Sequence, residues 1–167
     1  KSTVPIGTGR MIENIIRESG NGHKASIVSN PEFLREGSAI EDFMRPDRVV
    51  IGASDGEAIE LMKAIYAPLH SLEIPFVVTN VESSELIKYA ANGFLAMKIS
   101  FINECAVLCE KIGADVQDVA RGIGLDTRIG PKFLQAGIGY GGSCFPKDTS
   151  ALAEIAHSYD YNFQLIE

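Results

Sequence analysis

The sequence has few of the residues and segments that mark several classes of protein. No apolar run approaches the roughly 18 residues that a membrane-spanning helix needs, so no membrane partner or span is expected. Only three histidines occur (His23, His70 and His157), and their spacing is not that of a metal site. We therefore expect no bound metal and surface positions for these histidines.

Positive charge and cysteine are also scarce. The 15 Lys and Arg residues are outnumbered by 22 Asp and Glu residues, which gives a formal net charge of −7. This balance argues against nucleic acid or an anionic membrane as a partner, although a small phosphorylated ligand needs only local donors. The three cysteines, an odd number, favour reduced thiols and a cytoplasmic location. Cys105 and Cys109, four residues apart on an apolar helical face, are expected in the core.

A complete dinucleotide-binding fingerprint is absent. No strand pattern is followed by G-x-G-x-x-G, and Gly7-Thr8-Gly9 is only a partial match. Strand and helix patterns nevertheless alternate through the first half. We predict helices at 8–18, 32–43 and 54–66, the last opened by a capping box of Ser54 and Glu57, and strands at 25–29, 48–52 and 75–79. This alternation predicts a parallel, doubly wound sheet.

The pattern changes after residue 79. Thr79 and Glu82 form a second capping box, and no breaker follows until Gly113, which predicts a helix of about thirty residues, or roughly 45 Å. A broad apolar stripe runs along it (Phe94, Met97, Phe101, Cys105 and Leu108). A helix too long for a small lobe to cover indicates a domain connector or a dimer core.

The remaining segments complete the predicted architecture. Asp115 begins a shorter helix that ends at 121–122, a glycine-rich loop occupies 122–142, and a last helix runs from about 146 to 158 with Pro146 in its first turn. The predicted fold class is α/β: a partial Rossmann-like parallel sheet with helices at 1–79, and an all-helical domain on one long central helix at 80–167.

Cys144 is the most informative candidate for chemistry. It follows Gly141-Gly142-Ser143, stands just ahead of a predicted helix, and precedes Lys147 and Asp148 by three and four residues. A helix N-terminus and a nearby cation activate a thiol as a nucleophile, and glycines let the backbone pass close to a ligand. The alternatives are an incidental buried thiol and, for Asp148, a first-turn aspartate favoured by the helix dipole.

Two further pairs are spaced for chemistry. Glu32 and Glu36 lie four residues apart on a predicted helix, where two carboxylates on one face could act as general base or acid. Lys88 and Asn92 have the same spacing and could hold an oxyanion or a water. The alternatives are a solvated acidic face and an exposed lysine.

The loop at 128–142 mixes residues that suit a nucleotide ligand. It contains two cations, Arg128 and Lys132, two aromatic residues, Phe133 and Tyr140, and five glycines. Backbone N–H groups and cations suit a phosphate, and aromatic rings can stack on a base or sugar. The alternative is a flexible structural loop.

Four segments, taken together and in order, resemble the UDP-glucose/GDP-mannose dehydrogenase family over essentially the whole chain. They are KSTVP at 1–5, SNPEFLREG at 29–37, ELIKYAAN at 85–92 and GYGGSCFPKD at 139–148. A further segment, RPDRVVIG at 45–52, looks more like the UDP-glucose branch than the GDP-mannose or N-acetylmannosamine branches.

The resemblance implies an NAD-dependent, four-electron oxidation of UDP-glucose to UDP-glucuronate. In the family, a cysteine captures the aldehyde as a thiohemiacetal, which is oxidised to a thioester and hydrolysed. The implied catalytic residues are Cys144, Lys88, Glu32, Asn92, Asp148 and Thr3. The implied substrate contacts are Glu32, Phe33, Leu34, Arg35, Glu36, Lys88, Asn92, Arg128, Phe133, Gln135, Gly137, Gly139, Tyr140 and Gly141. The residues implied near NAD are Ser2, Thr3, Glu36, Cys144 and Lys147.

The resemblance also implies a homodimer through the long helix, and a chain that is an internal piece of a longer protein and inactive by itself. Steady NADH production from UDP-glucose by the 167-residue chain would refute that last expectation. Two other readings stay open: a non-catalytic nucleotide-sugar binding or dimerisation module, and a cysteine hydrolase, for which no histidine stands near Cys144 in sequence. Within the family, GDP-mannose or another nucleotide sugar is the alternative substrate.

Overall fold

The computed structural model describes residues 1–20 and 25–166, and the side chains of 70–72 are also outside the description. His23 and the side chain of His70 lie outside the described residues; His157 is exposed, as predicted. The chain divides into two compact units, Lys1–Lys88 and Tyr89–Glu167.

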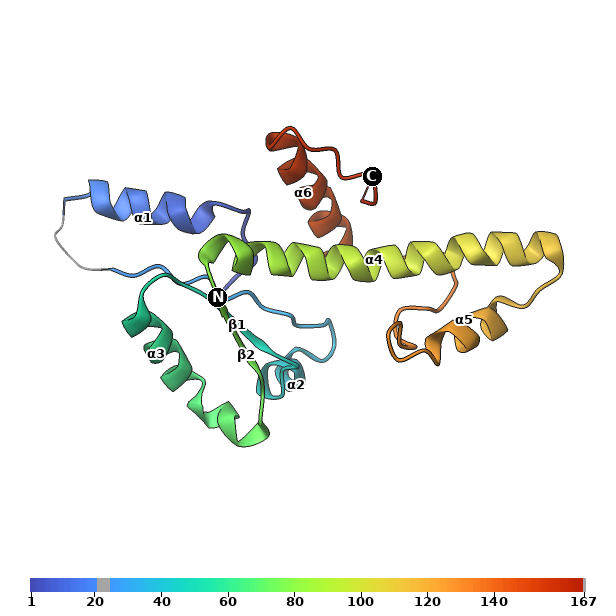
Figure 1. Ribbon diagram of the computed structural model, residues 1–167, viewed down its shortest axis with the longest axis horizontal. Helices are drawn as coiled ribbons and strands as arrows, with labels where there is room; N and C mark the ends of the chain where they lie inside the picture. Colours follow the sequence, from blue (N-terminus) through green and yellow to red (C-terminus); the bar gives the residue numbers. More distant parts are fainter. Residues whose placement is uncertain (21–24, 167) are drawn as a thin grey trace. The chain divides into compact units, whose positions relative to one another are not determined.

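The first unit is a small α/β structure. Its elements are α1 (Thr8–Glu18), α2 (Ala39–Met44), β1 (Val49–Gly52), α3 (Gly56–Ile65), the 3₁₀ helix η1 (Ala67–Leu72) and β2 (Phe76–Thr79). Strands β1 and β2 pair in parallel, with Val49 opposite Phe76, and the chain between them passes through α3 and η1 (Figure 1). This β-α-β connection confirms the predicted parallel sheet.

The core of this unit forms on β1. All four β1 residues are buried, and Val49 and Ile51 pack with Tyr66 and Leu69, with partly buried side chains from α3 and β2 around them. The apolar run VVI suits a strand covered on both faces. The Tyr66 hydroxyl donates to Asn30 Oδ1 at 2.6 Å, so this buried phenol has a partner.

Three predictions in this unit are wrong in detail. The helix predicted at 32–43 is reduced to α2, because the Glu32 and Asp42 carboxylates accept the N–H groups of Leu34 and Arg35, and such side-chain bonds compete with helical ones. The strand predicted at 25–29 forms only an isolated antiparallel bridge between Ser29 and Gly52.

The third error concerns helix caps. Asp55, not Ser54, caps α3 by accepting the N–H of Glu57 at 3.0 Å. At the start of α4 (Val81–Ile112), the Oδ1 of Asn80 accepts the N–H of Ser83 at 2.7 Å, in place of a Thr79 cap. Asp and Asn are preferred N-caps, and each stands one residue after the Ser or Thr that was chosen.

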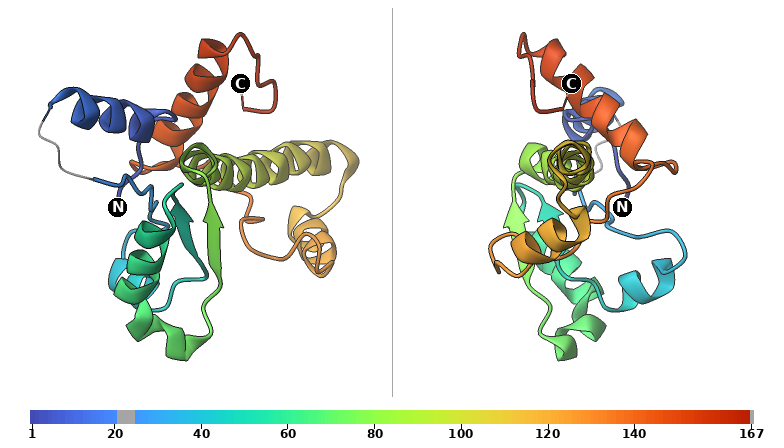
Figure 2. Two further views of the ribbon diagram at one scale, coloured as in Figure 1. Left: turned by 60° about the vertical axis from the view of Figure 1, so that its left-hand side comes forward. Right: turned by 90° about the vertical axis from the view of Figure 1, so that its right-hand side faces the viewer.

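The second unit is helical. It contains most of α4, then α5 (Val116–Gly124) and α6 (Phe145–Ser158). The 32-residue length of α4 confirms the predicted long helix, which ends before Gly113, a residue with φ +72° that favours glycine. The chain turns back after α4 (Figure 1; Figure 2, left). Asp115 caps α5 as predicted. Within the described part of the chain, no helix is long and apolar enough to cross a membrane.

The end of β1 approaches the start of α4 so closely that only glycine fits at residue 52. A Cβ there would lie 2.3 Å from the Ser84 Cβ and 2.8 Å from the Asn80 carbonyl oxygen. We expect Gly52→Ala to lower the free energy of unfolding by about 1–3 kcal/mol, because two backbones must separate. Gly122→Ala in α5, where a Cβ meets nothing within 4 Å, is the matched control and should lose nothing. Equal losses in urea unfolding of the two variants would contradict this account.

Candidate active site

A first group of predicted site residues gathers in the Lys1–Lys88 unit; we call Thr3, Glu32, Phe33 and Lys88 the N-terminal cluster. The Lys88 Nζ lies 3.6 Å from Glu32 Oε1, and the Thr3 hydroxyl donates to the same oxygen at 3.2 Å. Lys88 is 4% exposed, and its Nζ stands 5.4 Å from the centre of the Phe33 ring. Lys88 is therefore a buried, paired cation and not the exposed lysine of the alternative reading.

Glu32 is held in its ionised form. Burial raises the pKa of its carboxyl, but the hydrogen bond from the Leu34 N–H and the positive charge of Lys88 lower that pKa. The Thr3 hydrogen bond acts in the same direction, and the net result is a pKa below the ordinary value for glutamate. A carboxylate in this state is available to accept a proton.

This shift predicts how stability depends on pH. A carboxyl whose pKa is lower in the folded state stabilises the fold above its unfolded-state pKa, and that contribution is lost as pH falls through the folded-state pKa. We expect Glu32→Gln to destabilise the protein at neutral pH and to approach the wild type in acid, below the ordinary glutamate range. Unfolding measured from pH 7 to pH 2 (roughly the range of carboxyl titration) tests this. A difference that stays constant over this range would refute it.

Glu85 supports this cluster from one turn earlier on α4, and the sequence did not reveal it. Its carboxylate is 3% exposed and accepts the N–H groups of Gly7 at 2.7 Å and Gly9 at 2.9 Å, at the N-terminus of α1. Negative charge at a helix N-terminus is favourable. A glutamate early in a long helix resembles an ordinary solvated residue, so only the partial glycine motif at 7–9 hinted at this contact. Glu85 thereby anchors the segment that follows Thr3.

A second group gathers in the Tyr89–Glu167 unit; we call Asn92, Cys144, Lys147 and Asp148 the C-terminal cluster. The Asn92 Nδ2 donates to Asp148 Oδ2 at 2.6 Å, and Asp148 is 1% exposed. Among the described residues, Asp148 Oδ1 has no hydrogen-bond partner, although the Lys147 Nζ lies 3.4 Å away as an ion pair. A buried acceptor without a hydrogen bond lowers the stability of the fold. We therefore expect a water or a ligand to donate a hydrogen bond to Asp148 Oδ1.

Cys144 occupies the N-cap position of α6, so it stands at the helix N-terminus that the sequence predicted. Its side chain is partly exposed, and the Ser143 Oγ lies 3.8 Å from its sulfur. Asp148 follows one turn later, with its N–H donating to the Cys144 carbonyl at 2.9 Å. Cys109 is buried, as predicted, and Cys105 is partly buried. Of the three thiols, Cys144 alone combines partial exposure with a helix N-terminus.

The predicted cationic contacts are paired with neighbours. Arg35 forms an ion pair with Asp42, and the hydrogen bonds from Arg35 hold the pKa of that carboxyl well below its usual range. Arg128 pairs in the same way with Asp126 at 2.6 Å. Glu36 is exposed in the turn before α2, so the predicted helical face shared with Glu32 is wrong. Ser2 is also exposed.

The glycine-rich loop is tied to its surroundings. The rings of Phe133 and Tyr140 meet the Phe145 ring edge-on, at 6.1 and 5.7 Å between centres. Phe133 has φ +65°, which an aromatic residue rarely adopts, so this contact helps to offset backbone strain. The other predicted contacts of this loop are exposed (Gln135, Gly137, Gly139 and Gly141). Among the described residues, no group of three His, Cys, Asp or Glu side chains could hold a metal ion.

Comparison with known proteins places the chain among nucleotide-sugar dehydrogenases. Residues 82–167 match the central domain of the UDP-glucose/GDP-mannose dehydrogenase family, and residues 1–70 match the NAD binding domain of the same family. The chain is 64% identical over 169 residues to a UDP-glucose 6-dehydrogenase of Rhizobium meliloti, covering all of this chain and 39% of the relative. A Bacillus subtilis UDP-glucose 6-dehydrogenase is 56% identical, with 36% of its length covered.

A solved structure agrees. The structure of a UDP-glucose dehydrogenase from the archaeon Pyrobaculum islandicum superimposes with a TM-score of 0.93 at 46% identity, covering 99% of this chain and 38% of that chain. A GDP-mannose dehydrogenase ternary complex from a Pseudomonas species gives a TM-score of 0.68 at 34% identity, covering 98% of this chain and 38% of that one. The chain thus spans about two fifths of the length of the curated relatives that it matches.

Proposed function

Because this chain belongs to the UDP-glucose/GDP-mannose dehydrogenase family, we propose that it supplies the reacting side chains of an enzyme that oxidises UDP-glucose to UDP-glucuronate. One observation carries the proposal: Asp148, buried and with one oxygen lacking a hydrogen bond, lies one turn after a partly exposed thiol at a helix N-terminus. Buried side-chain acceptors are usually hydrogen-bonded, so a water or a substrate group is expected at this oxygen.

UDP-glucose is favoured over other nucleotide sugars by the degree of similarity. Relatives named for UDP-glucose share 64% and 56% identity with this chain, whereas the GDP-mannose dehydrogenase shares 34%. We propose the same domain boundary near residue 80 that the sequence predicts, since the two family domains match on either side of it.

The cofactor is NAD, as the match of residues 1–70 to the family's NAD binding domain supports. The chain's own residues fit one end of this cofactor: Ser2 is exposed and Thr3 partly exposed, beside a carboxylate and ahead of a helix N-terminus. We propose that Ser2, Thr3 and Glu36 line the nicotinamide, with Cys144 and Lys147 nearby. When bound, NAD accepts one hydride from the sugar carbon in each of two oxidations.

In the first oxidation, the C6 hydroxyl must lose a proton as its C–H bond breaks. We propose that this proton passes to a water held at Asp148 Oδ1, the oxygen that lacks a hydrogen bond. Asn92 fixes the carboxylate by donating to its other oxygen, Oδ2. Lys88 supplies a buried positive charge for the oxyanion that develops at C6. Each group is held within its own unit, Asp148 by Asn92 and Lys88 by Glu32.

Covalent capture follows. The Cys144 sulfur bonds to the aldehyde carbon as the S–H proton passes to the aldehyde oxygen, which gives a thiohemiacetal. In the second oxidation its C–H hydrogen leaves as hydride and its hydroxyl proton is released to water, which leaves a thioester. A water then attacks this carbonyl, the C–S bond breaks, and the sulfur leaves as the thiolate. We assign the acceptance of that water's proton to the Glu32 carboxylate. The aldehyde therefore never leaves the enzyme.

The substrate contacts follow the same two clusters. We propose that the sugar is held by Glu32, Lys88 and Asn92, and that the nucleotide part is held by two segments: Phe33, Leu34, Arg35 and Glu36 in one, and Arg128, Phe133, Gln135, Gly137, Gly139, Tyr140 and Gly141 in the other. To bind a phosphate, Arg128 must break its ion pair with Asp126. The charge-assisted hydrogen bonds lost to Asp126 are then replaced by similar bonds to the phosphate.

We also propose a homodimer through α4. Phe94, Phe101 and Leu108 are 60%, 55% and 55% exposed. Large apolar side chains grouped on an exposed surface are unfavourable in water and mark interaction sites. We expect Phe101→Asp to raise the dissociation constant of the dimer by roughly 30-fold or more, since it places a charge in the contact. Sedimentation of the full-length protein measures this, with the exposed Glu110→Gln as control. Unchanged sedimentation of Phe101→Asp would exclude this face.

The proposed activity is tested in a full-length enzyme. The matching segment of the Rhizobium meliloti relative is replaced by this chain, and NADH formation is followed with UDP-glucose and with GDP-mannose. We expect about two NADH for each UDP-glucuronate formed, from the four-electron balance, and little activity with GDP-mannose. A chimera that folds and binds UDP-glucose without oxidising it would support the non-catalytic module instead.

A further inference from the structure

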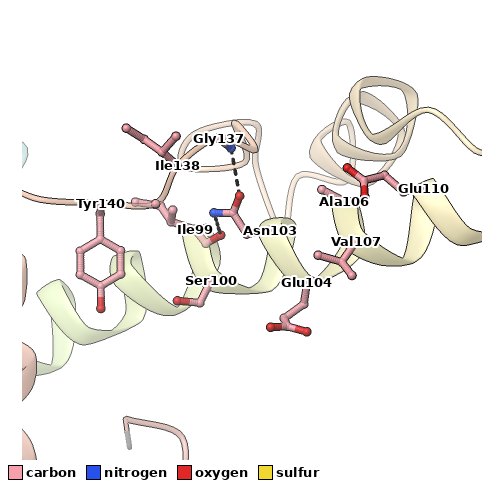
Figure 3. A pocket seen from close by; sticks show the side chains of 11 residues that line it. Ile99, Ser100, Asn103, Glu104, Ala106, Val107, Glu110, Gly137, Ile138 and Tyr140 are labelled. Carbon is pink, nitrogen blue, oxygen red and sulfur yellow. Dashed lines mark hydrogen bonds between the residues drawn. The ribbon is translucent and has the colours of Figure 1, made fainter.

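A cavity of about 590 Å³ lies beside the glycine-rich loop, between that loop and one face of α4 (Figure 3). Its lining includes two carboxylates, Glu104 and Glu110, and no cationic side chain among the described residues that form it. A diphosphate bound there would be repelled and would lack charged donors. The side of the loop facing this cavity is therefore poorly suited to hold the anionic part of a substrate.

What this side of the loop does contain is a fixed amide. The Asn103 Oδ1 accepts the N–H of Gly137 at 2.9 Å, and its Nδ2 donates to the Ile99 carbonyl at 2.9 Å (Figure 3). Both ends of the side-chain amide are used, so its orientation on α4 is set. Asparagine inside a helix usually lowers the stability of that helix. We therefore infer that Asn103 serves to hold the loop and not to stabilise α4.

The contact is placed where the loop is otherwise most free. Gly137 is the first of four glycines in the seven residues before Cys144, and each glycine adds backbone entropy that must be lost when the segment is ordered. Nearer its start, the loop is held by Lys98, whose Nζ donates to the Ile129 carbonyl at 3.0 Å. Nearer Cys144, the Tyr140 ring packs on Phe145. Asn103 holds the stretch between these two points.

We propose that Asn103 is a positioning residue for the reaction: through the Gly137 N–H it holds the glycine-rich segment in the conformation that presents the loop to the substrate and leads into Cys144. The inference rests on the proposed function, because it assumes that this segment contacts the substrate. Asn103 itself lies on the cavity side and acts through the loop backbone. Its loss would raise KM more than it lowers the rate of the bound substrate's reaction.

The test uses the full-length chimera with three variants. Asn103→Leu removes the acceptor, Asn103→Asp keeps an acceptor for the Gly137 N–H, and Ser100→Ala changes a neighbouring cavity residue that makes no bond to the loop. Hydrogen exchange of the Gly137 amide and steady-state kinetics are both measured. We expect Asn103→Leu to speed the exchange and raise KM by up to about tenfold each, as the loss of one hydrogen bond implies. Asn103→Asp should recover most of both effects, and Ser100→Ala should match the wild type.

A second pair of variants changes the loop partner of the same hydrogen bond and leaves α4 unaltered. It therefore controls for an effect of Asn103→Leu on the folding of α4. Gly137→Pro removes the N–H donor, and Gly137→Ala, which keeps it, is its reference. If both partners act through one bond, Asn103→Leu and Gly137→Pro together should raise KM no more than either alone. Additive effects, or an unchanged Gly137 exchange in Asn103→Leu, would overturn the inference while leaving the proposed function intact. A wild-type chimera that turns over no substrate would refute the proposed function, and the amide exchange would still decide whether Asn103 holds the loop.

Discussion

Replacing Cys144 with Ala should abolish the net oxidation of UDP-glucose in the full-length enzyme while leaving UDP-glucose binding within a few-fold of wild type. Without the sulfur no thiohemiacetal or thioester can form, and removal of a catalytic nucleophile commonly lowers kcat by about 10³-fold or more. UDP-glucuronate formation and calorimetric binding are the two measurements. Cys144→Ser is expected to fall between, since a hydroxyl keeps the geometry but is a weaker nucleophile.

The control for this experiment is Cys105→Ala, which changes a partly buried thiol on α4 that has no proposed role in the chemistry. It should retain activity. If Cys144→Ala kept its activity, the covalent route would be wrong and the thiol would be ordinary. If it lost binding together with activity, Cys144 would be serving the fold of the loop and not the chemistry.

The second large effect is expected at Asp148. Asp148→Asn preserves shape and burial but removes the charge that would order a water and accept its proton, so kcat should fall by about 10²–10⁴-fold with little change in KM. The carbonyl oxygen of the new amide can still accept the N–H of Asn92, and its NH2 group then takes the place of Oδ1, the oxygen that is proposed to hold the water. Product formation in single-turnover experiments measures the loss at the chemical step.

Glu154→Gln is the matched control for Asp148→Asn, because it neutralises an exposed carboxylate on the same helix, α6. It should leave both kcat and thermal stability unchanged. Restored activity in the double variant Asn92→Asp with Asp148→Asn would show that a carboxylate is needed in this pair at either position. A normal kcat in Asp148→Asn alone would remove Asp148 from the proposed mechanism.

The parts of the fold that the sequence predicted are those with a long or fully apolar pattern. The uninterrupted helix between residues 81 and 112 and the buried strand β1 both follow from local periodicity. The prediction of a helix at 32–38 was wrong although the spacing of the apolar residues there is helical. The Glu32 and Asp42 carboxylates accept backbone N–H groups that would donate to carbonyl oxygens in a helix. Such competition depends on where a side chain turns, which spacing alone does not record.

The site shows a similar division. Cys144 at the start of α6 agrees with a motif that the local sequence shows, whereas the burial of Lys88 and Asp148 could not be predicted from spacing. Glu85 and Asn103 could not be recognised, because each binds the backbone N–H of a glycine that is distant in sequence, 76 residues away from Glu85 and 34 from Asn103. A bond to a backbone N–H places no requirement on the partner's side chain, so the sequence contains no pattern that identifies it. Supporting residues of this kind can be recognised only from the structure.

The placement of Glu85, Lys88 and Asn92 on one helix limits how this protein can change its length. A one-residue insertion or deletion between Glu85 and Asn92 would turn the two residues about 100° relative to each other around the axis of α4. If the change fell between residues 85 and 88, the contact of Glu85 with the N-terminus of α1 and the ion pair of Lys88 with Glu32, both within the Lys1–Lys88 unit, would be out of phase with each other. Substitutions on the exposed side of these two turns should be tolerated, but a gap in an alignment there would mark a protein that has lost these contacts.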